Sequence, residues 1–384
     1  MEKVKIGIIG IGNMGTGHSI SIRDGFCPEL ELVAVADRRE VRRAWAQENL
    51  PGVQIFTEGE DLINSGLVDA IIIATPHYQH PTLAVKGFEK GLHVLSEKPA
   101  GVYTKAVREM NAAAEKSGKT FAMMFNQRTN CIYRKMKEII DSGELGQIRR
   151  VNWIITTWFR TQSYYDSGDW RGTWDGEGGG VLLNQCPHQL DLLQWICGMP
   201  CKVRAFTHNG KWHNIEVEDD VTAYLEYPNG ATGVFVTTTG DYPGTNRFEV
   251  TLDGGKLICE NDKLTLCKLN AMVSDVTKNA EQGFGKIESV TEVVETDGLN
   301  PQHRGVLNAF AGKILRGTPL VAEGCEGING LTLSNAMHLS SWTDSTVTLP
   351  LDEDLFLEEL TKRRESSCMK KTVSEKTFDT AGTY

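Results

Sequence analysis

The feature that most constrains the fold is a β-branched run that leads directly into three closely spaced glycines near the start of the chain. Residues 4–9 (VKIGII) are typical of a strand buried on both faces of a parallel sheet. The turn Gly10-Ile11-Gly12-Asn13-Met14-Gly15 follows, and residues 14–23 are expected to form a helix. Glycines let the backbone approach a pyrophosphate, and the N-terminus of the helix stabilises its charge. The turn therefore predicts a dinucleotide site that includes Gly10, Ile11, Gly12, Asn13 and Met14.

An acidic residue follows at the spacing that this kind of site requires. Residues 30–36 (LELVAVA) form a second predicted strand, which ends at Asp37, roughly 20 residues after the last glycine. A carboxylate there can accept hydrogen bonds from the adenosine ribose and would repel the 2′-phosphate of NADP. Arg38 and Arg39 adjoin it and could neutralise such a phosphate. We expect NAD, leave NADP open, and count Asp37 and Arg38 among the cofactor contacts.

Further strands at the rhythm of βαβ units complete the prediction of a doubly wound parallel sheet over residues 1–125. They are expected at 69–74, 93–96 and 120–125. Thr75-Pro76 ends the first of these three, on the side of the sheet where ligands bind, so we expect it to contact the cofactor together with His80. A purely structural role is an equal alternative for His77 and His80. Their spacing could suggest a metal site, but no third ligand is near, so no metal is expected.

Composition narrows the setting and the class of partner. The 384 residues predict about two domains, and no apolar run reaches the ~20 residues that span a bilayer. The net charge of −10 argues against a nucleic-acid partner, which requires a clustered basic face. Nine cysteines are scattered without a Cys-x-x-Cys pair, and the first residues do not form a secretory signal. We therefore expect reduced thiols, a cytoplasmic location and a small-molecule partner.

A second stretch rich in reactive groups is GEGGGVLLNQCPHQLDLLQW, residues 176–195. Pro187 fits the first turn of a helix, which should run toward Gly198. His188, Asp191 and Trp195 then share one face. For a lone histidine, the simplest interpretation of such a face is a solvated surface with a satisfied polar residue.

Glu97-Lys98-Pro99, at the end of the strand 93–96, is the specific element that changes this interpretation. Over nearly its whole length the chain resembles the Gfo/Idh/MocA family of glucose-fructose oxidoreductases and inositol dehydrogenases. The matching residues are the glycine turn, Asp37, Thr75-Pro76, Glu97-Lys98-Pro99, Gly179-Gly180, Leu182, Asn184, His188 and Asp191. The resemblance implies an NAD(P)-dependent oxidoreductase, in which a Rossmann domain precedes an α+β domain with an open-faced, mainly antiparallel sheet.

The residues beyond 125 agree with that second domain, 126–384. Long β-type stretches occupy 148–159, 202–212, 220–227, 231–239 and 248–252. Pro228-Asn229-Gly230 predicts a hairpin, residues 352–364 a late helix, and residues 366–384 a mobile tail. Few helices remain to cover so large a sheet. We therefore expect a homo-oligomer, a dimer or tetramer, through the face of the C-terminal sheet.

The resemblance also implies that Lys98 and His188 meet across the interdomain cleft, with Asn184 between them. His188 is then the candidate base, because imidazole titrates near the operating pH. Lys98 would bind the reacting oxygen, and the positive nicotinamide should lower its pKa. Many members carry aspartate where this chain has Asn184, which cannot neutralise Lys98. Cys186 is expected to pack, and Asp191 either orients His188 or lies on the helix surface.

The loop 158–174 is dense in aromatic and polar side chains, which suits the apolar faces and hydroxyls of a sugar. We expect Trp158 and Tyr165 to contact substrate, with packing of each ring inside its own domain as an equal alternative. By resemblance, Trp170 and Arg171 lie near the nicotinamide. Also by resemblance, Asn126 and Arg128 lie at the domain junction, where Asn126 is assigned to the cofactor and Arg128 to the substrate. Glu97 and Lys98 complete the cofactor contacts.

The predicted activity is hydride transfer between NAD and a secondary hydroxyl or ketone of a sugar or glycoside, with C3 of a glucose-like ring preferred. Inositol and other polyols are the nearest alternatives. A glycosidase or lyase that reduces and reoxidises NAD within one turnover would use the same residues. A silent nucleotide sensor is disfavoured, because Lys98 and His188 are both present.

Overall fold

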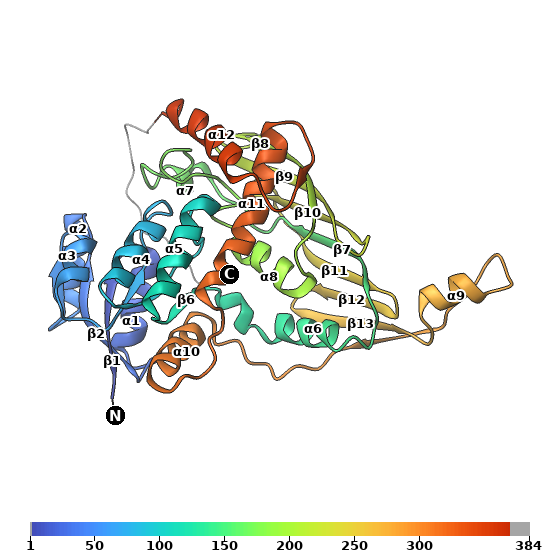
Figure 1. The fold of residues 1–384 in the computed structure, drawn as a ribbon, viewed down its shortest axis with the longest axis horizontal. Coiled ribbons are helices and arrows are strands. Elements are labelled where there is room, and N and C mark those ends of the chain that lie inside the picture. The colour runs from blue at the N-terminus through green and yellow to red at the C-terminus, as the bar shows by residue number, and fades with distance from the viewer. Residues whose placement is uncertain (1, 369–384) are drawn as a thin grey trace.

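The computed structural model describes residues 2–368, and its first domain is built on a six-stranded parallel sheet (Figure 1). The strand order is β3-β2-β1-β4-β5-β6, so the order reverses between β1 and β4. The strands are β1 (Val4–Ile9), β2 (Leu30–Ala36), β3 (Gln54–Phe56), β4 (Ala70–Ile73), β5 (His93–Ser96) and β6 (Phe121–Met123). All five strands expected from the sequence are present, the last of them shortened, and β3 is additional. Open α/β sheets bind ligands where the strand order reverses.

Helices cover both faces of this sheet, which explains why its strands are apolar on both sides. Ile6 and Ile8 of β1 point into a core with α1 (Asn13–Arg23) and α2 (Glu40–Asn49), whereas Ile9 points into the opposite one. That second core is closed by α3 (Gly59–Asn64), α4 (Gln79–Glu89) and α5 (Thr104–Ser117).

A late helix, α10 (Gln302–Arg316), returns to the first domain. Its residues Val306, Leu307 and Phe310 are buried in the same core as Ile6 and Ile8. In Figure 1 it lies beside the parallel sheet. The expected boundary at residue 125 falls just after β6, but the packing of α10 shows that a segment of the expected second domain belongs to the Rossmann core.

The second domain is built on a nine-stranded, mainly antiparallel sheet in the order β14-β13-β12-β11-β7-β10-β9-β8-β15, in which only β7 and β10 are parallel to each other. The strands are β7 (Ile148–Ile155), β8 (Lys202–Asn209), β9 (Glu218–Glu226), β10 (Thr232–Thr238), β11 (Asn246–Leu252), β12 (Gly255–Glu260), β13 (Lys263–Leu269), β14 (Ser289–Val293) and β15 (Val347–Thr348). The five expected β-type stretches are β7 to β11 with shifted ends, and the other four strands are additional.

Three helices pack on one face of this sheet: α6 (Cys131–Asp141), α8 (Pro187–Cys197) and α11 (Gly327–Trp342). Strand β7 shows the alternation, since Val151 and Trp153 are buried whereas Ile154 is 41% exposed on the other face. The Trp153 ring stacks on Phe248 of β11 with centroids 4.1 Å apart. The open-faced sheet expected from the resemblance is therefore confirmed.

The remaining elements include two that the sequence predicts closely. Pro228-Asn229-Gly230 joins β9 to β10, where Asn229 Oδ1 accepts a hydrogen bond from the backbone N–H of Ala231. Helix α12 (Glu353–Glu365) begins after Asp352, whose side chain caps Leu355. Short segments η1 (Asn126–Thr129), α7 (Gln162–Tyr165), α9 (Val273–Asn279) and η2 (Gly324–Glu326) complete the fold.

The expected mobile tail is described only at its beginning. Ser367 and Cys368 are held by hydrogen bonds to Glu216, and the rest of that segment, 369–384, lies outside the described residues. Within residues 2–368, no helix combines the length and the apolarity that crossing a bilayer would require.

Candidate active site

The glycine turn lies at the carboxyl edge of the parallel sheet, between β1 and α1. Gly10 has a φ of +89°, and a Cβ there would approach the carbonyl oxygen of Ala74 to 2.6 Å. A Cβ at Gly15 would overlap the carbonyl oxygen of Gly10, so only glycine lets α1 start this close to the turn. No acidic residue lies in the first turn of α1 and no side chain caps it at Gly12. The turn therefore fits a pyrophosphate, whose charge the backbone N–H groups at the start of α1 can stabilise.

Asp37 faces this turn from the end of β2. Its Oδ2 accepts a hydrogen bond from the Ile11 N–H at 2.9 Å, and its Oδ1 accepts one from the Arg39 N–H at 2.9 Å. Arg38 is paired with Glu58 at 2.8 Å. The carboxylate of Asp37 is thus held toward the turn, and the neighbouring Arg38 already has an acidic partner.

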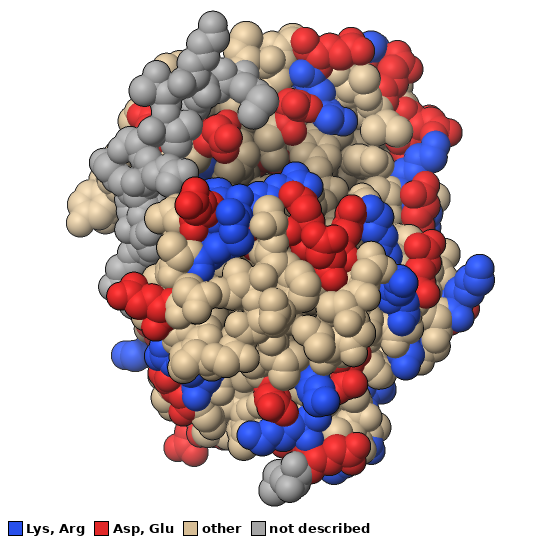
Figure 2. Space-filling view, turned by 90° about the vertical axis from the view of Figure 1, so that its left-hand side faces the viewer, with Lys and Arg blue, Asp and Glu red and all other residues tan. Residues whose placement is uncertain are grey.

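On the face of the molecule drawn in Figure 2, basic and acidic side chains are interspersed around an area of uncharged ones.

His77 and His80 follow Thr75-Pro76 and are both buried. The two ring nitrogens of His80 lie 2.7 Å from the carbonyl oxygens of Pro99 and Thr75, contacts that favour its structural alternative. His77 Nδ1 lies 3.1 Å from the Glu177 carbonyl oxygen. Burial, and then the charges of His80 and Lys98, hold the pKa of His77 well below its usual range. Within residues 2–368, no group of three or more His, Cys, Asp or Glu side chains is arranged to hold a metal ion.

Glu97 is a buried carboxylate that anchors the loop after β5. Its Oε1 lies 2.7 Å from His18 Nε2 of α1, and its Oε2 accepts a hydrogen bond from the Lys98 N–H at 3.2 Å. Burial raises the pKa of Glu97, but the hydrogen bond to His18 and the positive charges of His18, His303 and Lys98 together outweigh burial and lower the pKa to about 2. The ring of His303, at the start of α10, lies 5.6 Å from that of His18, and burial lowers its pKa to about 4. Neither His18 nor His303 is among the predicted site residues.

Lys98 reaches from the first domain into the second. Its Nζ donates a hydrogen bond to the backbone oxygen of Asn184 at 2.8 Å. Burial lowers the pKa of Lys98, and the positive charges of Arg160 and Arg171 add to this, whereas Glu97 opposes it. The structure therefore brings Lys98 and Asn184 together as the resemblance implies, through the backbone of Asn184.

His188 lies in the first turn of α8, which begins at Pro187 and ends before Gly198 as predicted. The solvated surface that a lone histidine would suggest is not found, because His188 and Asp191 of this face are buried and His188 is 3% exposed. Its ring lies edge-on to Phe125, with centroids 6.3 Å apart. Burial, and then the charge of Lys98, hold the pKa of His188 well below its usual range. The imidazole is thus neutral at neutral pH and has a nitrogen that can accept a proton.

Glu177 is the carboxylate that the sequence reasoning missed. It is 1% exposed, its Oε2 accepts a hydrogen bond from the Gly172 N–H at 2.6 Å, and its Oε1 accepts one from the Asn184 side-chain amide. Burial raises its pKa. The available signal was an acidic residue inside the glycine-rich run GEGGG.

Asp191 and Arg128 form a buried ion pair instead of facing the helix surface or the solvent. Two Arg128 nitrogens donate to Asp191 at 2.8 and 2.7 Å, and a third donates to Glu326 at 2.6 Å. The surface alternative for Asp191 is therefore wrong, because the side chain is buried between domain-junction elements. With its guanidinium engaged in this way, Arg128 is placed to hold the junction together.

The aromatic loop divides into buried and accessible members. Trp158 and Tyr165 are buried, and the Tyr165 hydroxyl lies 2.9 Å from Thr239 Oγ1, which favours packing within the domain. Trp170 and Arg171 are half-buried, with the guanidinium 4.5 Å from the Trp170 ring centroid. The Trp170 ring lies edge-on to His77, with centroids 5.6 Å apart, so this pair borders the junction.

Two further side chains are fixed at the junction. Asn126 is fully buried and donates to Gln302 Oε1, whereas no group within residues 2–368 is hydrogen-bonded to its Oδ1. Cys186 Sγ lies 3.0 Å from Thr237 Oγ1, and burial raises the pKa of the thiol to about 12. A thiol with so high a pKa is a poor nucleophile, in agreement with the expected packing role.

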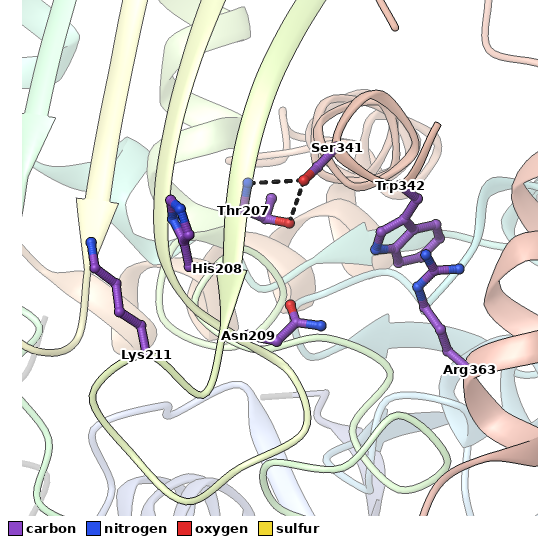
Figure 3. A pocket seen from close by; sticks show the side chains of 7 residues that line it. All are labelled: Thr207, His208, Asn209, Lys211, Ser341, Trp342 and Arg363. Carbon is purple, nitrogen blue, oxygen red and sulfur yellow. Dashed lines mark hydrogen bonds between the residues drawn. The ribbon is translucent and has the colours of Figure 1, made fainter. Parts of the chain in front are cut away.

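A separate hollow of about 510 Å³ lies between β8, α11 and α12 (Figure 3). It is lined by Thr207, His208, Asn209, Lys211, Ser341, Trp342 and Arg363. Lys211 is paired with Asp220, and Arg363 with Glu359. The hollow contains none of the predicted site residues, and Lys211 and Arg363 already have acidic partners, so the candidate site remains the one at the domain junction.

Several curated proteins are similar to this chain at low sequence identity. An inositol 2-dehydrogenase from Corynebacterium glutamicum (strain R) is 24% identical over 238 residues, 60% of this chain and 65% of that protein. A D-glucoside 3-dehydrogenase from Escherichia coli (strain K12) is 26% identical over 249 residues, 59% of this chain and 68% of that protein. The chain spans about half to two thirds of the length of the first curated relatives it matches.

Among solved structures, the WlbA dehydrogenase from Bordetella pertussis, in complex with NADH and UDP-GlcNAcA, has a TM-score of 0.76 and 26% identity. The match covers 91% of this chain and all of that one. Two family models also match: an oxidoreductase family with an NAD-binding Rossmann fold over residues 4–125, and the GFO/IDH/MocA C-terminal domain over residues 133–258. Since these two matches follow the two domains and together take in well over half of its length, the chain belongs to the GFO/IDH/MocA oxidoreductase family.

Proposed function

We propose that this chain transfers hydride between NAD and a secondary hydroxyl or ketone of a sugar or glycoside, with C3 of a glucose-like ring as the preferred position. The observation that carries the proposal is the junction at which Lys98 bonds the turn that bears Asn184 and leads into His188. The named activities of the relatives support it, since they include a D-glucoside 3-dehydrogenase and a structure with NADH and a UDP-sugar. The inositol 2-dehydrogenases among the relatives favour a polyol as the second candidate.

The first domain supplies the proposed cofactor contacts, and NAD when bound supplies the acceptor for the hydride. The glycine turn holds the pyrophosphate and Asp37 the adenosine ribose. The other proposed contacts are Arg38, Thr75, Pro76, Glu97, Lys98, Asn126, Trp170 and Arg171, whereas His80, with both ring nitrogens facing backbone carbonyl oxygens, is no longer among them. Because Arg38 is paired with Glu58 and Asp37 is negative, NAD is preferred over NADP.

Three side chains at the junction handle the proton and the reacting oxygen. His188, neutral at working pH, accepts the hydroxyl proton as the alcohol is oxidised. Lys98 donates a hydrogen bond to the same oxygen and, with its lowered pKa, is the alternative base. Asn184 orients a neighbouring hydroxyl through its amide.

Substrate recognition is assigned to the half-buried wall of Trp170 and Arg171 beside His77. Aromatic rings stack on the apolar C–H faces of sugars, and a guanidinium donates to hydroxyls. We assign an indirect role in substrate binding to Trp158, Tyr165 and Arg128, which support the residues that contact the substrate.

The test is to incubate the purified protein with NAD and a panel of sugars, glycosides and inositols, following nicotinamide absorbance and products. We expect NADH and a 3-keto product from a glucose-like compound. If inositols are oxidised in preference to sugars, the substrate is a polyol and the sugar proposal is wrong. Bond cleavage without accumulation of NADH would indicate the redox-neutral glycosidase or lyase.

We also propose a homo-oligomer, a dimer or tetramer, through the open face of the second sheet, and a cytoplasmic location. All nine cysteines are free thiols, and all lie within the described residues, which fits a reducing compartment.

A further inference from the structure

We propose that Glu177 is a positioning residue of the active site, which acts through Asn184 by fixing the amide of that side chain and the turn that receives Lys98. The step to catalysis rests on the proposed function, whereas the contact itself does not. Glu177 lies seven residues before Asn184 at the start of the glycine-rich run, and it is not among the residues that the sequence predicts for the site.

The geometry forms a chain of contacts across the domain junction. Gly172 N–H donates to Glu177 Oε2 at 2.6 Å, and the Asn184 amide nitrogen donates to Glu177 Oε1. The backbone oxygen of Asn184 then accepts the hydrogen bond from Lys98 Nζ at 2.8 Å. Glu177 therefore holds the side chain of the residue whose main-chain oxygen Lys98 contacts.

A carboxylate in this place determines which way the amide points. Ionised carboxylates accept hydrogen bonds only, so the nitrogen of Asn184 must face Glu177. The amide oxygen is left to accept from elsewhere, and within residues 2–368 no hydrogen bond is made to it. A substrate hydroxyl can donate to this oxygen. If Glu177 is protonated on Oε1, it can donate as well, and the orientation of the amide is no longer enforced.

Charged groups from several elements face Glu177. Burial, which raises its pKa, is opposed by Arg171 on the same loop and by the hydrogen bonds from Gly172 and Asn184. The negative charge of Glu218, on β9, adds to the effect of burial. His77, from the loop after β4, contacts the Glu177 carbonyl oxygen. A buried carboxylate costs stability that a neutral amide would not.

A carboxylate swap tests the proposal. The variants are Glu177→Gln, Asn184→Asp and the double variant with both changes. Asn184→Asp alone puts a half-buried carboxylate in contact with the buried carboxylate of Glu177, and the two cannot both ionise without a large cost. The double variant again has one carboxylate and one amide, in exchanged positions. Glu216→Gln is the matched control, because Glu216 also bonds this loop, at the Trp174 N–H (3.2 Å) and not at Asn184.

Thermal melting and cofactor binding are measured first, since neither requires a known substrate. Asn184→Asp should lower Tm at neutral pH, and adding Glu177→Gln should restore most of the loss. Because the pKa of Glu177 is raised in the folded state, its proton stabilises the fold at low pH, and this stability is lost as pH rises from the unfolded value of 4.5 through the folded pKa. The Tm of Glu177→Gln relative to the parent should therefore rise with pH. If the Tm change of the double variant equals the sum of the changes in the two single variants, the proposal is overturned.

On a confirmed substrate, Glu177→Gln should lower kcat by roughly 10- to 100-fold, since misplacement of a reacting group has effects of this size. It should also remove the acidic limb of the pH–rate profile that protonation of Glu177 causes. Glu216→Gln should change neither. An unaltered profile in Glu177→Gln would reduce Glu177 to a structural residue. If the Tm changes of the two substitutions are not additive but the protein oxidises no sugar or polyol, the proposed function is refuted. The contact between Glu177 and Asn184 would then still be supported.

Discussion

Lys98 is a partly buried ammonium whose hydrogen-bond partner in the second domain is a neutral carbonyl oxygen. A carbonyl satisfies a hydrogen bond but cannot offset a charge, so burial lowers the pKa of Lys98. The same positive charge helps keep His188 neutral. Burial, which is the largest cause for both groups, and the charge of Lys98 therefore lower the pKa values of the two candidate proton carriers together.

We predict that His188→Ala and Lys98→Ala each lose roughly 100- to 10,000-fold in kcat, the usual contribution of a positioned acid or base. NAD binding, measured by quenching of tryptophan fluorescence, should stay close to that of the parent for His188→Ala. A near-parent rate for His188→Ala on a confirmed substrate would transfer the role of base to Lys98.

Cofactor preference is also decided by single residues. Asp37 faces the turn, and Glu58 engages Arg38 at 2.8 Å. We predict that Glu58→Gln releases Arg38 to bind the 2′-phosphate and improves NADP affinity about 10-fold relative to NAD, the equivalent of one charge-assisted hydrogen bond. Glu60→Gln, which removes the partner of Lys86, is the control. Titration of each variant with NAD and with NADP measures the two affinities. If the ratio of the NADP and NAD affinities is unchanged in Glu58→Gln, Arg38 does not reach the ribose.

At the scale of elements, β9 holds the turn that delivers Asn184. The Glu218 carboxylate accepts hydrogen bonds from the Gly180 and Leu182 N–H groups, both at 2.9 Å, and lies 2.9 Å from His338 Nε2 of α11. A Cβ at Gly180 would overlap the carbonyl oxygen of Glu218. Glycine is therefore required at position 180 so that the loop can pack directly on β9. This packing fixes the position of the first turn of α8.

We predict that Gly180→Ala destabilises the protein by about 1–3 kcal/mol, the usual cost of overpacking, and lowers kcat as the turn shifts. Gly17→Ala is the matched control, since Gly17 is exposed in α1 and no atom lies within 4 Å of the position that a Cβ would take, so alanine there should be neutral or stabilising. Urea unfolding compares the two. Equal stability of both variants would contradict the packing argument.

The sequence predicts elements best where one local signal is strong. The strands 4–9, 30–36 and 93–96 and the helix at Pro187 are found at the expected positions, because apolar runs and a proline in the first turn act locally. Strands β12 to β15 and the return of α10 depend on pairing between distant segments, which periodicity does not show. Glu177 and the partners of Arg128 were missed for the same reason: their roles follow from contacts across the junction.

At the scale of the whole molecule, the open sheet face carries a row of mainly apolar side chains. Ile154 pairs in register with Val236, Val236 with Thr222, and Thr222 with Phe206, so these side chains form one row across four strands. Ile154 is 41% and Phe206 53% exposed, and Tyr224, 42% exposed, lies in the neighbouring row. A contiguous patch of this kind is typical of an interface that a second copy covers.

We predict that the protein is a dimer or tetramer through this face. Ile154→Asp or Phe206→Asp should shift the mass measured by light scattering after gel filtration to a smaller species, because a charge buried without a partner disfavours association. Val41→Asp is the control: Val41 lies on α2 of the other domain and is 58% exposed, so the same change there should leave the assembly intact. If the Ile154→Asp and Phe206→Asp variants keep the parent's mass, the interface lies elsewhere. If the unsubstituted protein is itself a monomer, the prediction that a second copy covers the apolar row is wrong. Since both positions lie on the face opposite α8 and its candidate base His188, loss of assembly with NAD binding retained would show that association uses a surface separate from the one that carries α8.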